Sequence, residues 1–245
     1  MVWDIETLEN APANVFSHGL EINANLNFAS VASSTNLPGL DDVFIMREFS
    51  DAASGQKAVN KWLDTLFEWE RVFYDQIPDE IKEAYSELSG IEDDKFSKQK
   101  TKKQRLKNCL KNLMTMPCFG YNSGMSHTVW AIFTLFLGKF DLKVLAPLIY
   151  AYARDNGVTV SCVKRDTNYL SMTLVKNGDR EQRISFKDVM NYTSPCTLDK
   201  FCKNWGSKLQ KSIFPYSYYS SVEQLLTATE FPPQSAFFNE MKQVL

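Results

Sequence analysis

The sequence predicts an α/β fold in which helices flank a mixed sheet. Three extended segments lie within the first fifty residues, and a long stretch with helical periodicity follows them. Alternating apolar and polar segments return after residue 157. Strands on both sides of a helical region are typical of helices packed against one sheet.

The N-terminal segments predict a mostly antiparallel group of three strands. They cover residues 2–7, 27–33 and 43–49, and the last ends in a turn rich in Ser and Ala. Side chains alternate between the two faces of a strand, so Asp4 and Glu6 are expected on the same face.

The middle of the chain predicts three helices. Apolar residues recur at helical spacing from Gln56 to Phe73, and Pro78 ends that helix. Asp79 and Glu80 suit the first turn of a second helix, which extends to about Leu88. Residues 95–111 form a third, with eight basic residues. It is either a charged surface helix or a contact with the DNA backbone, and acidic residues in 80–94 could neutralise it.

The second half predicts a strand, a helix and then an antiparallel meander. Residues 116–121 suit a buried strand, and residues 141–154 a helix that Pro147 should kink. The meander covers residues 158–165, 169–175 and 183–189. A short helix over residues 198–205 should stop at Gly206, and two more short helices should flank Pro232 and Pro233.

Composition indicates a soluble intracellular protein. The 245 residues carry a formal net charge of −2, with 44% hydrophobic and 23% charged residues. The five cysteines include no Cys-x-x-Cys pair and the chain has two histidines, so neither a zinc site nor a disulfide framework is expected. No signal peptide is visible, and the most apolar run, residues 129–137, is shorter than the roughly 20 residues that span a bilayer.

Two motifs carry chemistry. Asp4-Ile5-Glu6-Thr7 places two carboxylates in an otherwise apolar strand, a suitable half-site for Mg²⁺, which prefers oxygen ligands. Tyr121-Asn122-Ser123-Gly124 and Lys139-Phe140-Asp141 form two halves of a second motif, separated by an apolar run. Two divalent ions about 4 Å apart can activate a water and stabilise the leaving oxygen of a phosphodiester.

These motifs resemble the first and second exonuclease motifs of family B DNA polymerases. Downstream segments resemble the protein-primed branch found in linear plasmids, viruses and mobile elements; they are Ile184-Ser185-Phe186-Lys187-Asp188, Leu198-Asp199-Lys200-Phe201, Gly206 and Phe214-Pro215-Tyr216. The similarity covers roughly residues 2 to 225. It implies a ribonuclease H-like (DnaQ-like) exonuclease fold, 3′–5′ hydrolysis for proofreading during DNA replication, and a terminal priming protein as partner of the full-length enzyme.

The resemblance also implies roles for single residues. Asp4, Glu6 and Asp141 would be the catalytic carboxylates that hold two Mg²⁺ or Mn²⁺ ions. Thr7, Asn122 and Phe140 would hold the single-stranded 3′ end of DNA, where an aromatic ring can stack on a base without reading its identity.

The chain departs from the family pattern in three ways. Asn122 and Asp141 are nineteen residues apart instead of about five, which leaves fourteen extra residues, Met125 to Gly138. The third exonuclease motif, Tyr-x-x-x-Asp, is absent from the sequence, and so are the polymerase signatures. We therefore expect residues 1–245 to form a single partial exonuclease domain at the N-terminus of a polymerase, with a helical insertion at about 56–111, an anomalous insert at 125–138 and impaired activity.

Two other interpretations remain open. The chain could be a non-catalytic remnant of a mobile-element polymerase that retains at most nucleic-acid or protein binding. It could also be a different nuclease with the same fold, because one fold supports many activities.

Overall fold

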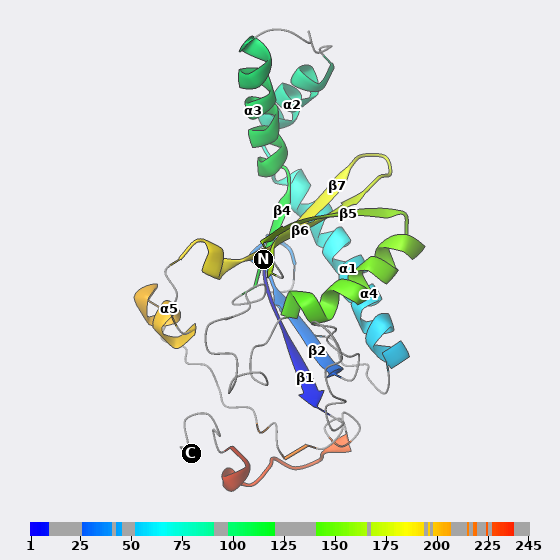
Figure 1. The fold of residues 1–245 in the computed structure, drawn as a ribbon, viewed down its shortest axis with the longest axis vertical. Helices are drawn as coiled ribbons and strands as arrows, with labels where there is room; N and C mark the ends of the chain where they lie inside the picture. Colours follow the sequence, from blue (N-terminus) through cyan, green and yellow to red (C-terminus); the bar gives the residue numbers. More distant parts are fainter. Residues whose placement is uncertain are drawn as a thin grey trace.

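The antiparallel start that the sequence predicts is confirmed in the computed structural model (Figure 1). β1 (Val2–Glu9) pairs with β2 (Leu26–Ser34), which pairs with β3 (Val43–Ile45), both in antiparallel fashion. The structure describes residues 1–9, 26–40, 43–45, 52–90, 98–120, 141–165, 168–193, 196, 198–206, 215, 218–219, 224 and 227–237. The last part of the predicted third strand, residues 46–49, lies outside them.

The sheet is mixed and has seven strands in the described part of the chain, in the order β3-β2-β1-β4-β7-β6-β5. β4 (Met116–Gly120) lies between β1 and β7 (Gln182–Asp188) and is parallel to both. β6 (Asn168–Lys176) and β5 (Val158–Arg165) continue the sheet with antiparallel pairs, which confirms the predicted meander. The predicted α/β class with a mixed sheet is therefore correct.

α1 (Ala52–Asp75) supplies much of the core. Its apolar residues recur at helical spacing, so Trp62, Leu63 and Leu66 all face inward and are completely buried. The indole of Trp62 donates a hydrogen bond of 2.7 Å to the Ser33 hydroxyl of β2, and its ring lies 5.5 Å from that of Phe186 in β7. α1 thus packs across the strands on both sides of β1 and β4.

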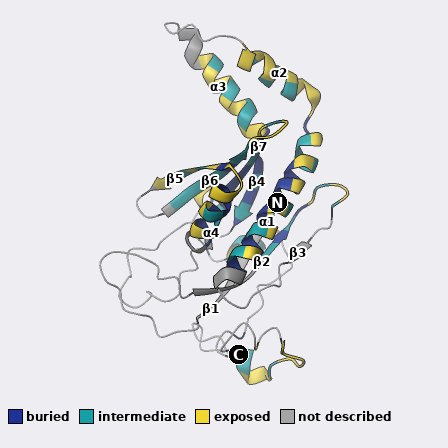
Figure 2. Cartoon of the chain, turned by 90° about the vertical axis from the view of Figure 1, so that its right-hand side faces the viewer, coloured by how far each residue is buried: buried dark blue, intermediate teal, exposed yellow. Residues whose placement is uncertain are grey.

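α4 (Asp141–Asp155) packs beside α1 and continues through Pro147 as one helix. Leu145 and Ile149 are completely buried, and the Tyr152 hydroxyl donates a hydrogen bond of 2.7 Å to Asp64 of α1. Figure 2 shows the buried residues gathered where these two helices meet the central strands.

The segment 56–111, expected as one helical insertion, divides into two parts. α1 belongs to the core, whereas α2 (Asp79–Gly90) and α3 (Lys98–Leu113) form a hairpin that extends beyond the sheet (Figures 1 and 2). No residue of α2 is buried. Lys111 of α3 lies 3.7 Å from Glu181 before β7, an ion pair that ties the base of the hairpin to the sheet.

The elements after the sheet are short. β7 ends at Asp188, one residue before the predicted end, because its carboxylate accepts a hydrogen bond from the Met190 amide and caps the 3-10 helix η1 (Val189–Asn191). α5 (Leu198–Asn204) follows, and Gly206 has a φ of +77°, as expected for a glycine that ends a helix. The 3-10 helix η2 (Gln234–Phe237) follows the two prolines. Among the described helices, none has the length and apolar character needed to cross a membrane.

Candidate functional site

The first motif lies in the middle of the sheet. Asp4, Glu6 and Thr7 belong to β1, which has β2 on one side and β4 on the other. The pairing with β2 is regular from Val2 to Glu6. The strand therefore alternates as expected over this part, which is the basis for placing Asp4 and Glu6 on the same face. The register then shifts between Glu6 and Thr7, and an irregularity of this kind bends a strand and re-aims the residues after it. The side chains of the motif lie outside the described part of the structure.

The parallel pair of β1 and β4 sets the first motif level with the end of β4. Val2 pairs with Phe119, whose amide donates a hydrogen bond of 3.0 Å to the Met1 carbonyl. Gly120, the last residue of β4, is then level with position 3 of β1. Asp4 is consequently the first residue of β1 beyond the point where β4 ends and the second motif begins.

The topology brings the start of α4 toward the same edge of the sheet. β5 is antiparallel to β6, and β6 is antiparallel to β7, so β5 runs parallel to β7 and to β4. A helix that joins two parallel strands of one sheet must return from the edge where the first strand ends. α4 makes this return, and Asp141 is its first residue.

Two of the six predicted site residues cannot be placed in this way. Asn122 and Phe140 lie in residues 121–140, outside the described part of the chain, as does the insert 125–138. No group of three potential metal ligands occurs among the described side chains, a set that excludes those of Asp4, Glu6 and Asp141. The structure therefore gives the backbone positions of four of the six predicted residues, Asp4, Glu6, Thr7 and Asp141. The expectation of a metal site rests on the chemistry of their carboxylates.

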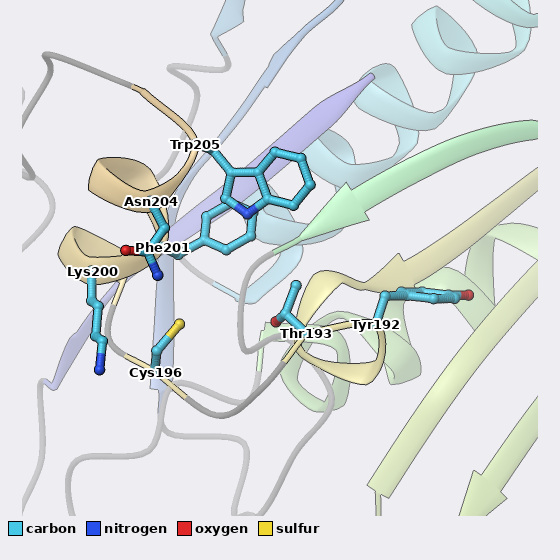
Figure 3. Close-up of a pocket in the computed structure, with 7 residues that line it drawn as sticks. All are labelled: Tyr192, Thr193, Cys196, Lys200, Phe201, Asn204 and Trp205. Carbon is cyan, nitrogen blue, oxygen red and sulfur yellow. The ribbon is translucent and has the colours of Figure 1, made fainter.

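A hollow of about 430 Å³ lies between the residues that follow η1 and the helix α5 (Figure 3). Phe201 and Trp205 lie together on one side, with their ring centroids 6.0 Å apart. Tyr192 lies on the other side, and its ring points away from them. Trp205 and Tyr192 are 75% and 66% exposed, which is unusually open for large aromatic residues. The remaining lining residues are Thr193, Cys196, Lys200 and Asn204.

This aromatic hollow lies near the strand pair β1–β4, close to the start of the first motif. The Tyr192 ring contacts Phe119 edge to face, with centroids 6.4 Å apart, and Phe119 is the β4 residue that pairs with Val2. Among the described side chains that line the hollow, Lys200 is the one charged group. Exposed aromatic rings can stack on bases. The Lys200 side chain points away from the Phe201 and Trp205 rings (Figure 3).

Sequence reasoning singled out Leu198 to Phe201 but gave these residues no binding role, and it did not single out Tyr192 or Trp205. The sequence offered one signal for Trp205, which is an aromatic residue directly before a helix-ending glycine, Gly206.

Comparison of the chain with protein-family models, characterised proteins and solved structures found no match. The motifs and the geometry described above are therefore the basis for assigning a function.

Proposed function

We propose that this chain is the 3′–5′ exonuclease part of a protein-primed family B DNA polymerase and that its own exonuclease activity is strongly impaired. The substrate is the single-stranded 3′ end of DNA, and the reaction is hydrolysis of the terminal phosphodiester. The parent enzyme acts in DNA replication and starts synthesis from a terminal priming protein. The fold assigned to the domain is the ribonuclease H-like exonuclease fold.

One observation carries the proposal. The two motifs that resemble the exonuclease motifs are far apart in the sequence, yet the parallel pairing of β1 with β4 sets Asp4 just beyond the end of β4. The second motif starts at the next residue, Tyr121, and its carboxylate Asp141 begins the helix that returns from that edge. An arrangement in which both motifs meet at one sheet edge supports a shared site.

The carboxylates of Asp4, Glu6 and Asp141 would hold the divalent ions, which when bound supply a nucleophilic water and charge stabilisation at neutral pH. Oxygen ligands of this type fit Mg²⁺ and Mn²⁺. Thr7, Asn122 and Phe140 would hold the 3′ end in line with those carboxylates. The aromatic hollow beside Phe119 supports the proposal independently, because it offers stacking surfaces for the unpaired strand leading to the site.

The proposed impairment follows from spacing. Fourteen extra residues separate Asn122 from Asp141, and the third motif is absent from the sequence. A ligand displaced by even about 1 Å can cost on the order of 10²-fold in rate.

Digestion of a single-stranded oligonucleotide labelled at its 5′ end tests the proposal. With Mg²⁺ or Mn²⁺ and protein in excess over DNA, we expect slow, stepwise shortening from the 3′ end that stops when EDTA is added. Asp4→Ala and Glu6→Ala should each abolish it. Glu68→Ala, at an exposed position of α1, is the matched control and should leave the rate unchanged.

Each alternative outcome has a distinct meaning. Shortening that survives both Asp4→Ala and Glu6→Ala would show that the proposed carboxylates are not responsible. Rapid digestion that Asp4→Ala abolishes would overturn the proposed impairment. No digestion at any protein concentration would instead favour the second candidate, a non-catalytic remnant of a mobile-element polymerase, which the anomalous insert also favours.

A further inference from the structure

α3 is a helix of unbalanced charge. Its sixteen residues include seven Lys or Arg and no Asp or Glu. Within the hairpin, α2 carries four carboxylates and one lysine. The two helices therefore differ in charge: all four carboxylates lie on α2, and seven of the eight cations lie on α3.

Exposure shows how the two faces of α3 differ. Lys103, Lys107, Leu110 and Lys111 are half-buried and follow helical spacing, so they form the face toward α2. Lys102, Arg105, Cys109 and Asn112 are exposed and lie on the opposite side. We call this second set, together with Gln104 and Asn108 beside it, the outer face of α3.

The carboxylates of α2 do not cover this outer face. Asp79, Glu83 and Glu87 are exposed and follow one another at intervals of four, which places them on one stripe of α2. The α2 residues that are half-buried, including Tyr85 and Leu88, occupy the other side of that helix. The acidic stripe consequently faces away from α3, and the Asp79 carboxylate pairs with Lys82 of its own helix at 3.1 Å.

The outer face also carries side-chain amides. Gln104 and Asn108 are both exposed, and the Gln104 amide donates a hydrogen bond of 3.0 Å to the Asn108 carbonyl oxygen. Within α3 this face combines cations with amides and has no carboxylate. Such a combination matches the groups that proteins direct toward phosphate and sugar oxygens. From Lys102 to Asn112 this face spans about 15 Å, calculated from about 1.5 Å per residue. That length corresponds to about four nucleotides along one strand of a duplex.

We propose that the outer face of α3 binds the phosphodiester backbone of DNA. The hairpin extends beyond the sheet, so this contact is separate from the edge where the two motifs meet (Figure 1). The binding is independent of sequence, because Lys and Arg side chains on phosphates carry no base information. Leu106 and Leu113, 51% and 57% exposed beside this face, would instead suit a protein partner such as a second copy of the chain, and the experiment separates the two.

The test measures binding of a blunt, fluorescein-labelled DNA duplex of about 20 base pairs by anisotropy in EDTA, across a series of salt concentrations. The Lys102→Gln/Arg105→Gln variant removes two outer-face cations, and Lys57→Gln/Arg71→Gln removes two exposed cations of α1 as the matched control. We expect the first variant to bind at least fivefold more weakly at low salt. Its slope of log affinity against log salt should be smaller by about 1.8, at about 0.9 per lost phosphate contact.

Three results would overturn this assignment. The unaltered chain could fail to bind the duplex, the outer-face variant could retain the affinity and salt slope of the unaltered chain, or the α1 variant could lose as much. Analytical ultracentrifugation measures self-association of the chain. If the unaltered chain associates with itself but does not bind DNA, and the outer-face variant abolishes the association, the surface binds a second copy of the chain instead. Circular dichroism checks that both variants are folded. A blunt duplex in EDTA does not test hydrolysis, and Asp4→Ala should bind it normally, so failure of the nuclease proposal would leave this result intact.

Discussion

The guanidinium of Arg180 donates hydrogen bonds to both carboxylate oxygens of Glu70, at 2.8 and 2.7 Å. Glu70 is completely buried on α1, and Arg180 lies in the turn between β6 and β7, 110 residues away. The Gln182 amide and the Arg183 backbone N–H also donate to the same carboxylate, at 3.0 and 3.3 Å. The end of α1 is thereby fixed to the start of β7, directly below the α2–α3 hairpin.

Glu70→Gln should therefore destabilise the protein strongly. The substitution keeps the shape but leaves the Arg180 guanidinium without its counter-charge, and breaking a buried pair costs about 3–5 kcal/mol. Arg180 retains 27% side-chain exposure, so we expect the lower end of that range. Urea unfolding measures the change, with Glu68→Gln at an exposed position of α1 as control, expected within about 0.5 kcal/mol of the unaltered chain. A Glu70→Gln protein as stable as this control would show that the ion pair between Glu70 and Arg180 does not stabilise the fold.

Glu181 should make the fold sensitive to acid. Partial burial disfavours its charge, but the Arg183 guanidinium at 2.6 Å and Lys111 at 3.7 Å outweigh it and lower the pKa of the Glu181 carboxyl. Because this pKa is lower in the folded state, the charged form stabilises the fold. This contribution to the free energy of unfolding is fully present above about pH 4.3, the pKa of a Glu carboxyl in the unfolded chain. It is lost as the pH falls through the lower pKa of Glu181 in the folded state.

Urea unfolding of the unaltered chain and of Glu181→Gln at several pH values checks this. The difference in unfolding free energy should be constant from about pH 7 to 6 and should shrink below about pH 4. Glu181 is 42% exposed, so about 1 M salt should reduce the difference at neutral pH. A difference that grows on acidification would have the wrong sign for this ion pair.

Trp205→Ala should weaken the binding of single-stranded DNA. Its ring is one wall of the aromatic hollow, and stacking of one base on an aromatic side chain contributes about 1–3 kcal/mol. We expect at least a fivefold loss of affinity for a labelled oligo-dT in EDTA. Phe231→Ala, which removes an aromatic ring that is 94% exposed elsewhere, is the matched control. Equal losses in the two variants would show that the hollow has no special part in binding.

Local patterns predicted the elements well, because their periodicity reflects the surfaces that they bury. The spacing of Trp62, Leu63 and Leu66 predicted α1, and the alternation in residues 183–189 predicted β7, which the structure shows at 182–188. Gly206 was correctly placed at the end of α5, since few other residues adopt a positive φ at low cost.

Relations between distant segments could not be derived in the same way. Glu70 follows Leu66 by four residues and precedes Phe73 by three, so it lies on the apolar stripe of α1 and its burial could be predicted. Its partners Arg180 and Gln182 come from a distant turn and could not be. The parallel neighbour of β1 likewise depends on the return of the chain through α1, the hairpin and β4. The sequence therefore supplied the candidate carboxylates, whereas the pairing of Val2 with Phe119 was needed to set them level with the second motif.

Removal of residues 125–138 should raise exonuclease activity. The deletion changes the separation of Asn122 and Asp141 from nineteen residues to five, the spacing of the family that the motifs resemble. If the insert displaces a carboxylate ligand, its removal should increase the rate of 3′ shortening on the order of 10- to 100-fold, because misplacement of a catalytic group has effects of that size. The rate would remain below that of a complete site, since the third motif is absent from the sequence.

Asp141→Asn, made in both backgrounds, separates recovery of the site from a general effect of the deletion. If the insert displaces Asp141 from the metal site, Asp141→Asn should barely change the slow rate of the unaltered chain. In the deletion variant, the same substitution should remove the gain, and Asp155→Asn at the exposed end of α4 should leave it in place. Circular dichroism and a thermal melt show whether the deletion variant folds. If the folded deletion variant gains no exonuclease activity, or if Asp141→Asn leaves the gain unaffected, Asp141 is not a ligand of the proposed metal site.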